Sequence, residues 1–145
     1  PYLKRSFFDI VQEKMRDDVL LVMAHRDGKY IAGALNFIGR DTLFGRYWGC
    51  NEDHSCLHYE LCYYQAIEYA LLNKLKRVEA GAQGEHKIAR GFAPTITRSH
   101  HFIQHPDFRD AIARHILQEN LHVKRYFQAC GDATPFKMPE AELKI

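Results

Sequence analysis

Three strand-like segments joined by short turns most constrain the fold of this chain. Residues 19–24 form a continuous apolar run, and the dipeptide Asp27-Gly28 separates that run from a second strand-like segment at 30–38. Asp-Gly between two such runs predicts a type I′ turn, which needs positive φ at both central positions. A second short polar turn leads to a third strand at 43–48. The segment therefore predicts an antiparallel meander.

The rest of the chain predicts helices on both sides of this meander. Gly33, inside the second strand, indicates a bulge or a close approach of the backbone. Hydrophobic spacing and helix-end signals predict the other elements, which are a helix at 3–16, a helix at 56–77, strands at 78–81 and 94–103, and a helix from Pro106 to about Cys130 that ends at Gly131. This order predicts an α+β fold, with a mixed sheet flanked by helices, in preference to a doubly wound α/β fold.

The size and composition indicate one globular domain. The chain has 145 residues, of which 46% are hydrophobic and 26% charged, and this excludes a disordered chain. We expect a domain at 1–131, an irregular tail at 132–145, and a fragment of a longer protein. The net charge is 20 − 18 = +2, which by itself does not indicate nucleic-acid binding.

No segment resembles a membrane span or a secretory signal. No apolar run approaches the ~18–20 residues that cross a bilayer, and the first five residues lack a signal-peptide pattern. We therefore expect a cytoplasmic protein whose four cysteines are reduced, with Cys62 and Cys130 in the core of their helices.

Glu60 is the first candidate catalytic residue. In the predicted helix at 56–77, helical spacing places Glu60 on one apolar face, with Tyr64, Ile67, Leu71 and Leu75. A partly buried carboxylate there could act as a general base. Alternatively, Glu60 stabilises the helix N-terminus or pairs with Arg46. We expect Asp53 or Ser55 to cap this helix, and Lys74, Lys76 and Arg77 to lie in its last turn.

The segment 79–90 forms the second candidate cluster. It follows a predicted strand and contains Glu79, Gln83, Gly84, His86, Lys87 and Arg90. Loops at strand ends commonly hold sites, and the two basic residues could neutralise a phosphate or carboxylate. No phosphate-loop pattern is present. The alternative is a solvated turn.

Two further groups of residues have a structural alternative. Cys50, His54, Cys56 and His58 could suggest zinc, but four ligands within nine residues would strain the backbone, so we predict no metal and a polar loop. Arg46 and Trp48 lie at the end of the third predicted strand. They could form one wall of a substrate groove, or this segment could instead contribute aromatic packing between strands.

Three segments of the chain resemble a known family. They read HYELCYYQ at 58–65, EAGAQGEHKIARGF at 79–92 and PTITRSHH at 94–101. The chain resembles bacterial predicted N-acyltransferases, relatives of the FemABX peptidoglycan-bridge aminoacyl transferases. The resemblance implies the C-terminal one of two acetyltransferase-like (GNAT) domains. It also implies transfer of an acyl or aminoacyl group to an amine, with acyl-coenzyme A or aminoacyl-tRNA as the donor and a peptidoglycan precursor as a candidate acceptor.

The chain departs from the GNAT pattern in one place. GNAT enzymes hold the coenzyme A pyrophosphate on a glycine-rich turn before the central helix, where backbone N–H groups capture the anion. Here the corresponding segment, 49–55, lacks those glycines and contains Glu52 and Asp53, which repel a pyrophosphate. An aminoacyl-tRNA donor escapes this objection, although the small net charge gives tRNA little support.

We therefore predict an acyltransferase. The candidate bases are Glu60 and Glu79, with His86 third. The candidate substrate-binding residues are Arg46, Trp48, Gln83, Gly84, Lys87, Arg90 and Ser99. The alternative is a non-catalytic GNAT-like module that binds cell-wall peptide or a partner protein.

Overall fold

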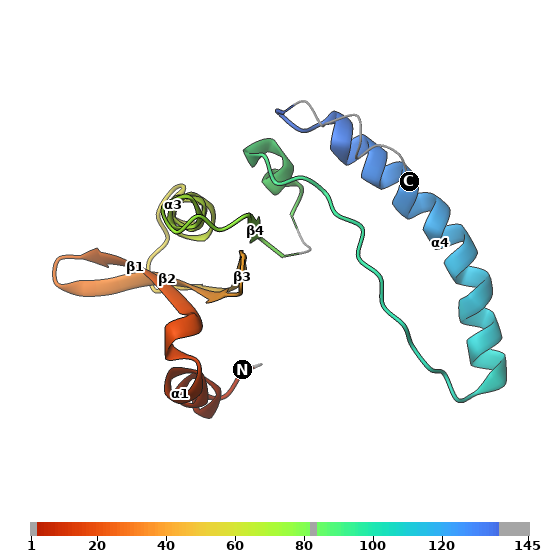
Figure 1. Cartoon of the computed structure of the whole chain (residues 1–145), viewed down its shortest axis with the longest axis horizontal. Helices are drawn as coiled ribbons and strands as arrows, with labels where there is room; N and C mark the ends of the chain where they lie inside the picture. The colour runs from red at the N-terminus through yellow and green to blue at the C-terminus, as the bar shows by residue number, and fades with distance from the viewer. Residues whose placement is uncertain (1–2, 82–83, 137–145) are drawn as a thin grey trace. The chain divides into compact units, whose positions relative to one another are not determined.

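The chain divides into two compact units, Pro1–Ala82 and Gln83–Ile145. The computed structural model describes residues 3–81 and 84–136, and we describe each unit by itself (Figure 1). The expected single domain at 1–131 stays a prediction.

A four-stranded mixed sheet forms the centre of the first unit. Its strands lie in chain order, and they are β1 (Val19–Arg26), β2 (Lys29–Ile38), β3 (Thr42–Cys50) and β4 (Arg77–Glu79). The first three pair antiparallel, and β3 pairs parallel with β4. The predicted meander and the α+β class are confirmed.

The β1–β2 turn and Gly33 follow the sequence predictions. Asp27 and Gly28 have φ of 49° and 80°, as a type I′ turn requires. Gly33 lies opposite Met23, and a Cβ atom on Gly33 would come within 2.7 Å of the Met23 sulfur. The predicted close approach is therefore present, while the irregularity in the β1–β2 pairing falls at Ala24/His25.

The long helix predicted at 56–77 is shorter and less regular than expected. It consists of α2 (Leu57–Tyr59), a π-helical segment (Glu60–Tyr64) and α3 (Gln65–Leu72). The chain leaves it through Lys74, whose φ is 56°. The Lys74 and Leu75 amides donate to the carbonyls of Leu71 and Ala70 at 3.2 and 2.8 Å, which is a Schellman ending.

The expected basic last turn is therefore wrong. Lys74, Lys76 and Arg77 all follow the end of α3, and Arg77 is already the first residue of β4.

The buried face of this helical segment also differs from the predicted stripe. Leu61, Tyr63, Ala66 and Ala70 are buried, whereas the side chain of Leu71 is 74% exposed. A π turn spans one residue more per hydrogen bond than an α turn. It therefore rotates the following residues away from the positions that α-helical counting gives.

Opposite faces of the sheet contact different helices. On one face, Leu61 packs against Ala32 and Ala34 of β2, and Figure 1 shows α3 along this side. On the other face, Phe7 of α1 (Arg5–Lys14) makes an edge-to-face contact with Tyr47 at 6.2 Å between centroids. Neighbouring strand residues point to opposite faces, so Trp48, next to Tyr47, joins the α3 side.

Asp41 joins the beginnings of β3 and β4. Its carbonyl accepts the backbone N–H groups of Lys76 and Arg77 at 2.8 and 3.2 Å. Its carboxylate accepts the Thr42 hydroxyl at 3.0 Å and an Arg77 guanidinium N–H at 3.3 Å. The parallel pairing that follows starts at Thr42 opposite Arg77, so Asp41 sets the register of the two strands.

The second unit contains a 3-10 segment (Glu85–Arg90) and the long helix α4 (Pro106–Asp132). Pro106 begins α4 as predicted, but the helix passes through Gly131. The Tyr126 hydroxyl donates to the Glu85 carboxylate at 3.4 Å. Contact with the Cys130 thiol, and then the charge of Glu85, raise the pKa of Tyr126. These interactions link α4 to the 3-10 segment.

The strand predicted at 94–103 is wrong, because residues 92–104 form no helix or strand. Thr95, Ile96 and Thr97 favour extended backbone, but strand propensity depends on packing against neighbouring strands. Within the described residues of the second unit, no strand is available to pair with this segment.

We predict that Asp41→Asn weakens the fold in a pH-dependent way. Hydrogen bonding by Thr42 and then the Arg77 guanidinium lower the pKa of Asp41 below its ordinary value of 3.8. A carboxyl with a lowered folded-state pKa stabilises the fold above its unfolded-state pKa, and this contribution is lost as the pH falls through the folded-state pKa. In urea unfolding, the variant should be less stable at neutral pH and approach the wild type in strong acid. Asp17→Asn is the control. A loss of stability in Asp41→Asn that does not change with pH would contradict the argument.

Candidate functional site

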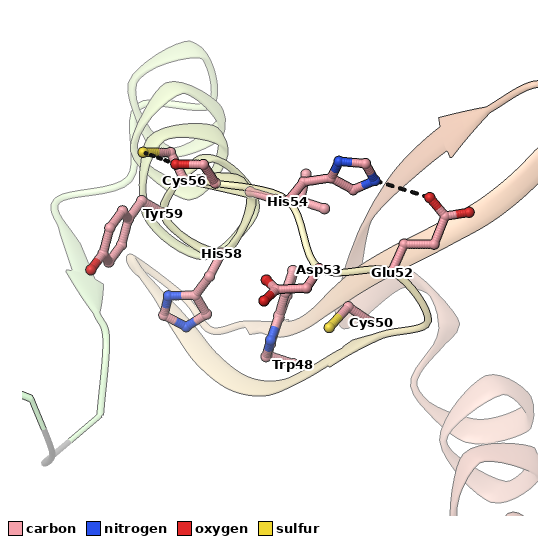
Figure 2. Close-up of a pocket in the computed structure, with 10 residues that line it drawn as sticks. Trp48, Cys50, Glu52, Asp53, His54, Cys56, His58 and Tyr59 are labelled. Atoms are coloured by element: carbon pink, nitrogen blue, oxygen red, sulfur yellow. Dashed lines mark hydrogen bonds and ion pairs between the residues drawn. The ribbon is translucent and has the colours of Figure 1, made fainter.

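A pocket of about 260 Å³ lies where β3 ends and the chain turns into α2. Figure 2 shows its lining, which comes from the last residues of β3, the connecting loop and the first helical turn. The lining residues are Trp48, Cys50, Glu52, Asp53, His54, Ser55, Cys56, Leu57, His58 and Tyr59. We call this the β3–α2 pocket.

Aromatic rings form one wall of the β3–α2 pocket. The ring of His58 makes edge-to-face contacts with Trp48, Tyr59 and Tyr63, at centroid distances of 5.2, 5.6 and 5.3 Å. Tyr63 is buried, and Trp48 also packs against the core beneath α3. This wall is therefore held in place by the core.

Ion pairs neutralise one of the two loop carboxylates. An Arg26 guanidinium nitrogen lies 2.8 Å from the Glu52 carboxylate, and His54 Nε2 lies 3.0 Å from the same oxygen. Arg26 comes from the end of β1, so this contact joins the β1–β2 hairpin to the loop. No ion pair of the described residues includes Asp53, which leaves Asp53 as the uncompensated charge of the pocket.

The helix at this pocket begins with an unusual backbone. Cys56 precedes α2 with a φ of 65°, in the left-handed region that L-residues rarely adopt. No side chain caps the helix, so the expected cap by Asp53 or Ser55 is wrong. The π-helical segment follows within one turn, and such segments frequently occur at functional sites.

The structure does not assemble a metal centre from these residues. Cys50, His54, Cys56 and His58 all line the pocket. Within residues 3–81 and 84–136, however, no three His, Cys, Asp or Glu side chains are placed to hold a metal ion. All four cysteines are free thiols, with Cys130 buried and Cys62 half-buried.

Glu60 does not point into the core. Its side chain is exposed, and its carboxylate accepts a hydrogen bond from the Gln65 amide at 2.9 Å. The expected inward orientation is wrong because the buried face of the helix contains Leu61 instead. Arg46, the suggested partner of Glu60, is also exposed, and its guanidinium lies 5.5 Å from the centroid of the Phe44 ring.

Glu79 lies where β3 and β4 separate. It is the last residue of β4, is exposed, and stands opposite Phe44. Beyond this pair, β3 continues to Cys50, and no described strand pairs with residues 45–50 on the β4 side. Gly45 permits a close approach here, because a Cβ atom on it would lie 3.4 Å from the Glu79 carbonyl oxygen. A carboxylate and a strand edge thus meet at one place.

The remaining predicted residues belong to the second unit. One of them, Gln83, lies outside the described residues. The His86 ring lies beside Gly84, whose φ is 103°. Arg90 donates to the His86 carbonyl at 2.8 Å, and Lys87 lies in the same 3-10 segment. Ser99 and His101 are 2.8 Å apart in the irregular segment.

Comparison with known families identifies the group to which the chain is related. The sequence model of the FemAB-like family, described as peptidoglycan biosynthesis/recognition, matches residues 1–138. The chain belongs to the FemAB-like family. No curated protein and no solved structure matches it. For this member of the FemAB-like family, none of the helices in the described residues is long and apolar enough to cross a membrane.

Sequence reasoning found only part of the β3–α2 pocket. The sequence predicts Trp48 as a substrate-binding residue, but not His58 or Tyr59. It indicates Asp53 only as a helix cap and as a charge that opposes phosphate. The available signal was a polar loop after a strand, followed by an aromatic and histidine-rich helix start. The contact of His58 with Tyr63 could not be anticipated because Tyr63 lies in the π-helical segment.

We predict that Cys56→Gly stabilises the fold by about 1 kcal/mol, because glycine adopts positive φ without the cost that L-residues incur there. Thermal or urea unfolding would measure this change. Cys50→Gly is the matched control: Cys50 is also exposed and lines the pocket, but it lies in β3. Glycine there should destabilise by about 0.5–1 kcal/mol. An equal loss of stability in both variants would contradict the role assigned to the backbone of Cys56.

Proposed function

We propose that the chain transfers an acyl or aminoacyl group to an amine in peptidoglycan metabolism, on a GNAT-like fold that is one of two such domains in a longer protein. The observation that carries this proposal is the position of Glu79 at the separation of β3 and β4. The family's link to peptidoglycan biosynthesis or recognition supplies the substrate class.

In the proposed reaction, the acceptor ammonium first loses one proton to solvent, and a carboxylate is the base for the second proton, which the nitrogen loses as it forms its new bond. The nitrogen attacks the carbonyl carbon of the donor and forms the new C–N bond. The C–S bond of an acyl-coenzyme A, or the C–O bond of an aminoacyl-tRNA, breaks as the tetrahedral intermediate collapses. The proton held by the carboxylate can pass to the leaving sulfur or oxygen, so the carboxylate is regenerated.

Glu79 is the preferred base among the candidate carboxylates. It is exposed, so a substrate can reach it, and it adjoins the strand edge formed by residues 45–50. A strand edge offers backbone N–H groups, which can stabilise the oxyanion of the intermediate. Glu60 remains the second candidate, although its carboxylate already accepts the Gln65 amide.

The basic and polar residues outside this edge are proposed to bind the donor. Lys87 and Arg90 carry positive charge suited to phosphate groups, with Gly84, Gln83 and Ser99 as further contacts, and His86 as a third candidate base. Phosphate groups occur in both coenzyme A and tRNA, so this assignment holds for either donor. Arg46, which lies within the strand edge at 45–50, is proposed separately as a substrate-binding residue.

We predict that Glu79→Gln lowers kcat at least about 100-fold, because general base catalysis contributes roughly 10²–10⁴-fold. The assay is transfer from acetyl-coenzyme A or an aminoacyl-tRNA to an amine-bearing muropeptide, with the intact protein. Glu68→Gln, a change to an exposed glutamate on α3, is the control and should keep full activity. Full activity of both Glu79→Gln and Glu60→Gln would exclude these carboxylates as the base. Muropeptide binding without turnover of any donor would favour the non-catalytic binding module.

A further inference from the structure

We infer that the β3–α2 pocket binds a primary ammonium group, carried on an aliphatic chain, through the Asp53 carboxylate and the aromatic wall of Trp48 and Tyr59. In the proposed reaction this group belongs to the amine-bearing acceptor. The inference therefore rests on the proposed function, but it is tested by binding alone.

The charge of the pocket favours a cation. Glu52 and Asp53 line it, and the Glu52 carboxylate is paired with Arg26 at 2.8 Å and with His54 at 3.0 Å. Because Arg26 faces Glu52 and no ion pair of the described residues includes Asp53, the Asp53 carboxylate adds a negative charge that no nearby cation compensates. The same charge opposes a pyrophosphate, which carries several negative charges.

The aromatic wall adds a second attraction for the same ligand. A cation over the face of a tryptophan or tyrosine is attracted by the electrons of the ring, most strongly by tryptophan. Trp48 and Tyr59 both line the pocket with Asp53 (Figure 2). The apolar edges of these rings and Leu57 also suit the methylene groups that carry a primary amine.

The volume agrees with a small group of this kind. A pocket of about 260 Å³ lies slightly below the ~300–1,000 Å³ of drug-sized ligand sites. It can hold an alkylammonium end group while the rest of a larger acceptor extends into solvent.

Trp48 makes this inference directly measurable, because it is the single tryptophan of the chain. Titration of the whole chain with n-butylammonium, at constant ionic strength, should give a saturable change in Trp48 fluorescence. The neutral n-butanol, of the same chain length, should bind more weakly. Asp53→Asn should weaken butylammonium binding by about fivefold or more, as expected for removal of a nearby opposite charge. Asp17→Asn, which changes an exposed carboxylate in the 3-10 turn before β1, should leave it unchanged.

Variants of the Arg26–Glu52 pair test the charge argument with opposite signs. Arg26→Gln leaves Glu52 with less compensation and should tighten butylammonium binding about two- to fivefold. Glu52→Gln leaves Arg26 with Asp27 alone, at 3.8 Å, and should weaken butylammonium binding by a similar factor. The double variant should return to nearly the wild-type affinity. A purely structural role for the pair would instead weaken binding in both single variants.

Equal binding of butylammonium and butanol, an unchanged affinity in Asp53→Asn, or saturable binding of inorganic pyrophosphate in this pocket would overturn the inference. These failures are distinguishable from failure of the proposed function. Transfer to a muropeptide amine without butylammonium binding would keep the function and reject this site. Specific butylammonium binding without transfer to any amine would keep the site and reject the transferase.

Discussion

The parallel contact between β3 and β4 is the constraint on which the first unit depends. Two antiparallel strands can be joined by a short turn, but a parallel pair requires a crossover connection. In this chain the crossover contains the helical segment 57–72 and the loop and helix residues that line the β3–α2 pocket. Asp41 closes that crossover, because its carbonyl and carboxylate both bind the beginning of β4. The position of Glu79, two residues after Arg77, follows from the same contact.

The pocket and the strand separation share β3 as a common scaffold. Residues near the start of β3 pair with β4, and residues at its end form the aromatic wall. A proton acceptor at Glu79 and a cation site at Asp53 would thus be connected by one strand whose opposite edge is paired with β2. Sites supported by strands are held more rigidly than sites formed by loops alone. The Arg26–Glu52 ion pair extends this support to the loop itself.

The sequence predicted the elements that depend on local chemistry. The Asp27-Gly28 turn, the three meander strands, the start of α4 at Pro106 and the close approach at Gly33 all follow from the conformational preferences of neighbouring residues. The incorrect predictions concern segments whose conformation depends on contacts with residues distant in the sequence. The strand expected at 94–103 has no partner in the second unit, and the inward orientation of Glu60 assumed an uninterrupted α-helix. The pocket was only partly foreseen, because pairing of Glu52 with Arg26 joins residues 26 positions apart.

The π-helical segment lets this part of the chain differ in length by one residue without a change in the packing of the helix that follows. A π turn holds one residue more than an α turn, so deleting one residue between Glu60 and Tyr64 would give an uninterrupted α-helix. The residues after the deletion would keep their orientation, and Ala66 and Ala70 would stay buried. Relatives that lack one residue in this segment should therefore keep the fold but lose the ring contact between His58 and Tyr63. A one-residue gap here in a sequence alignment would then mark the loss of the π turn.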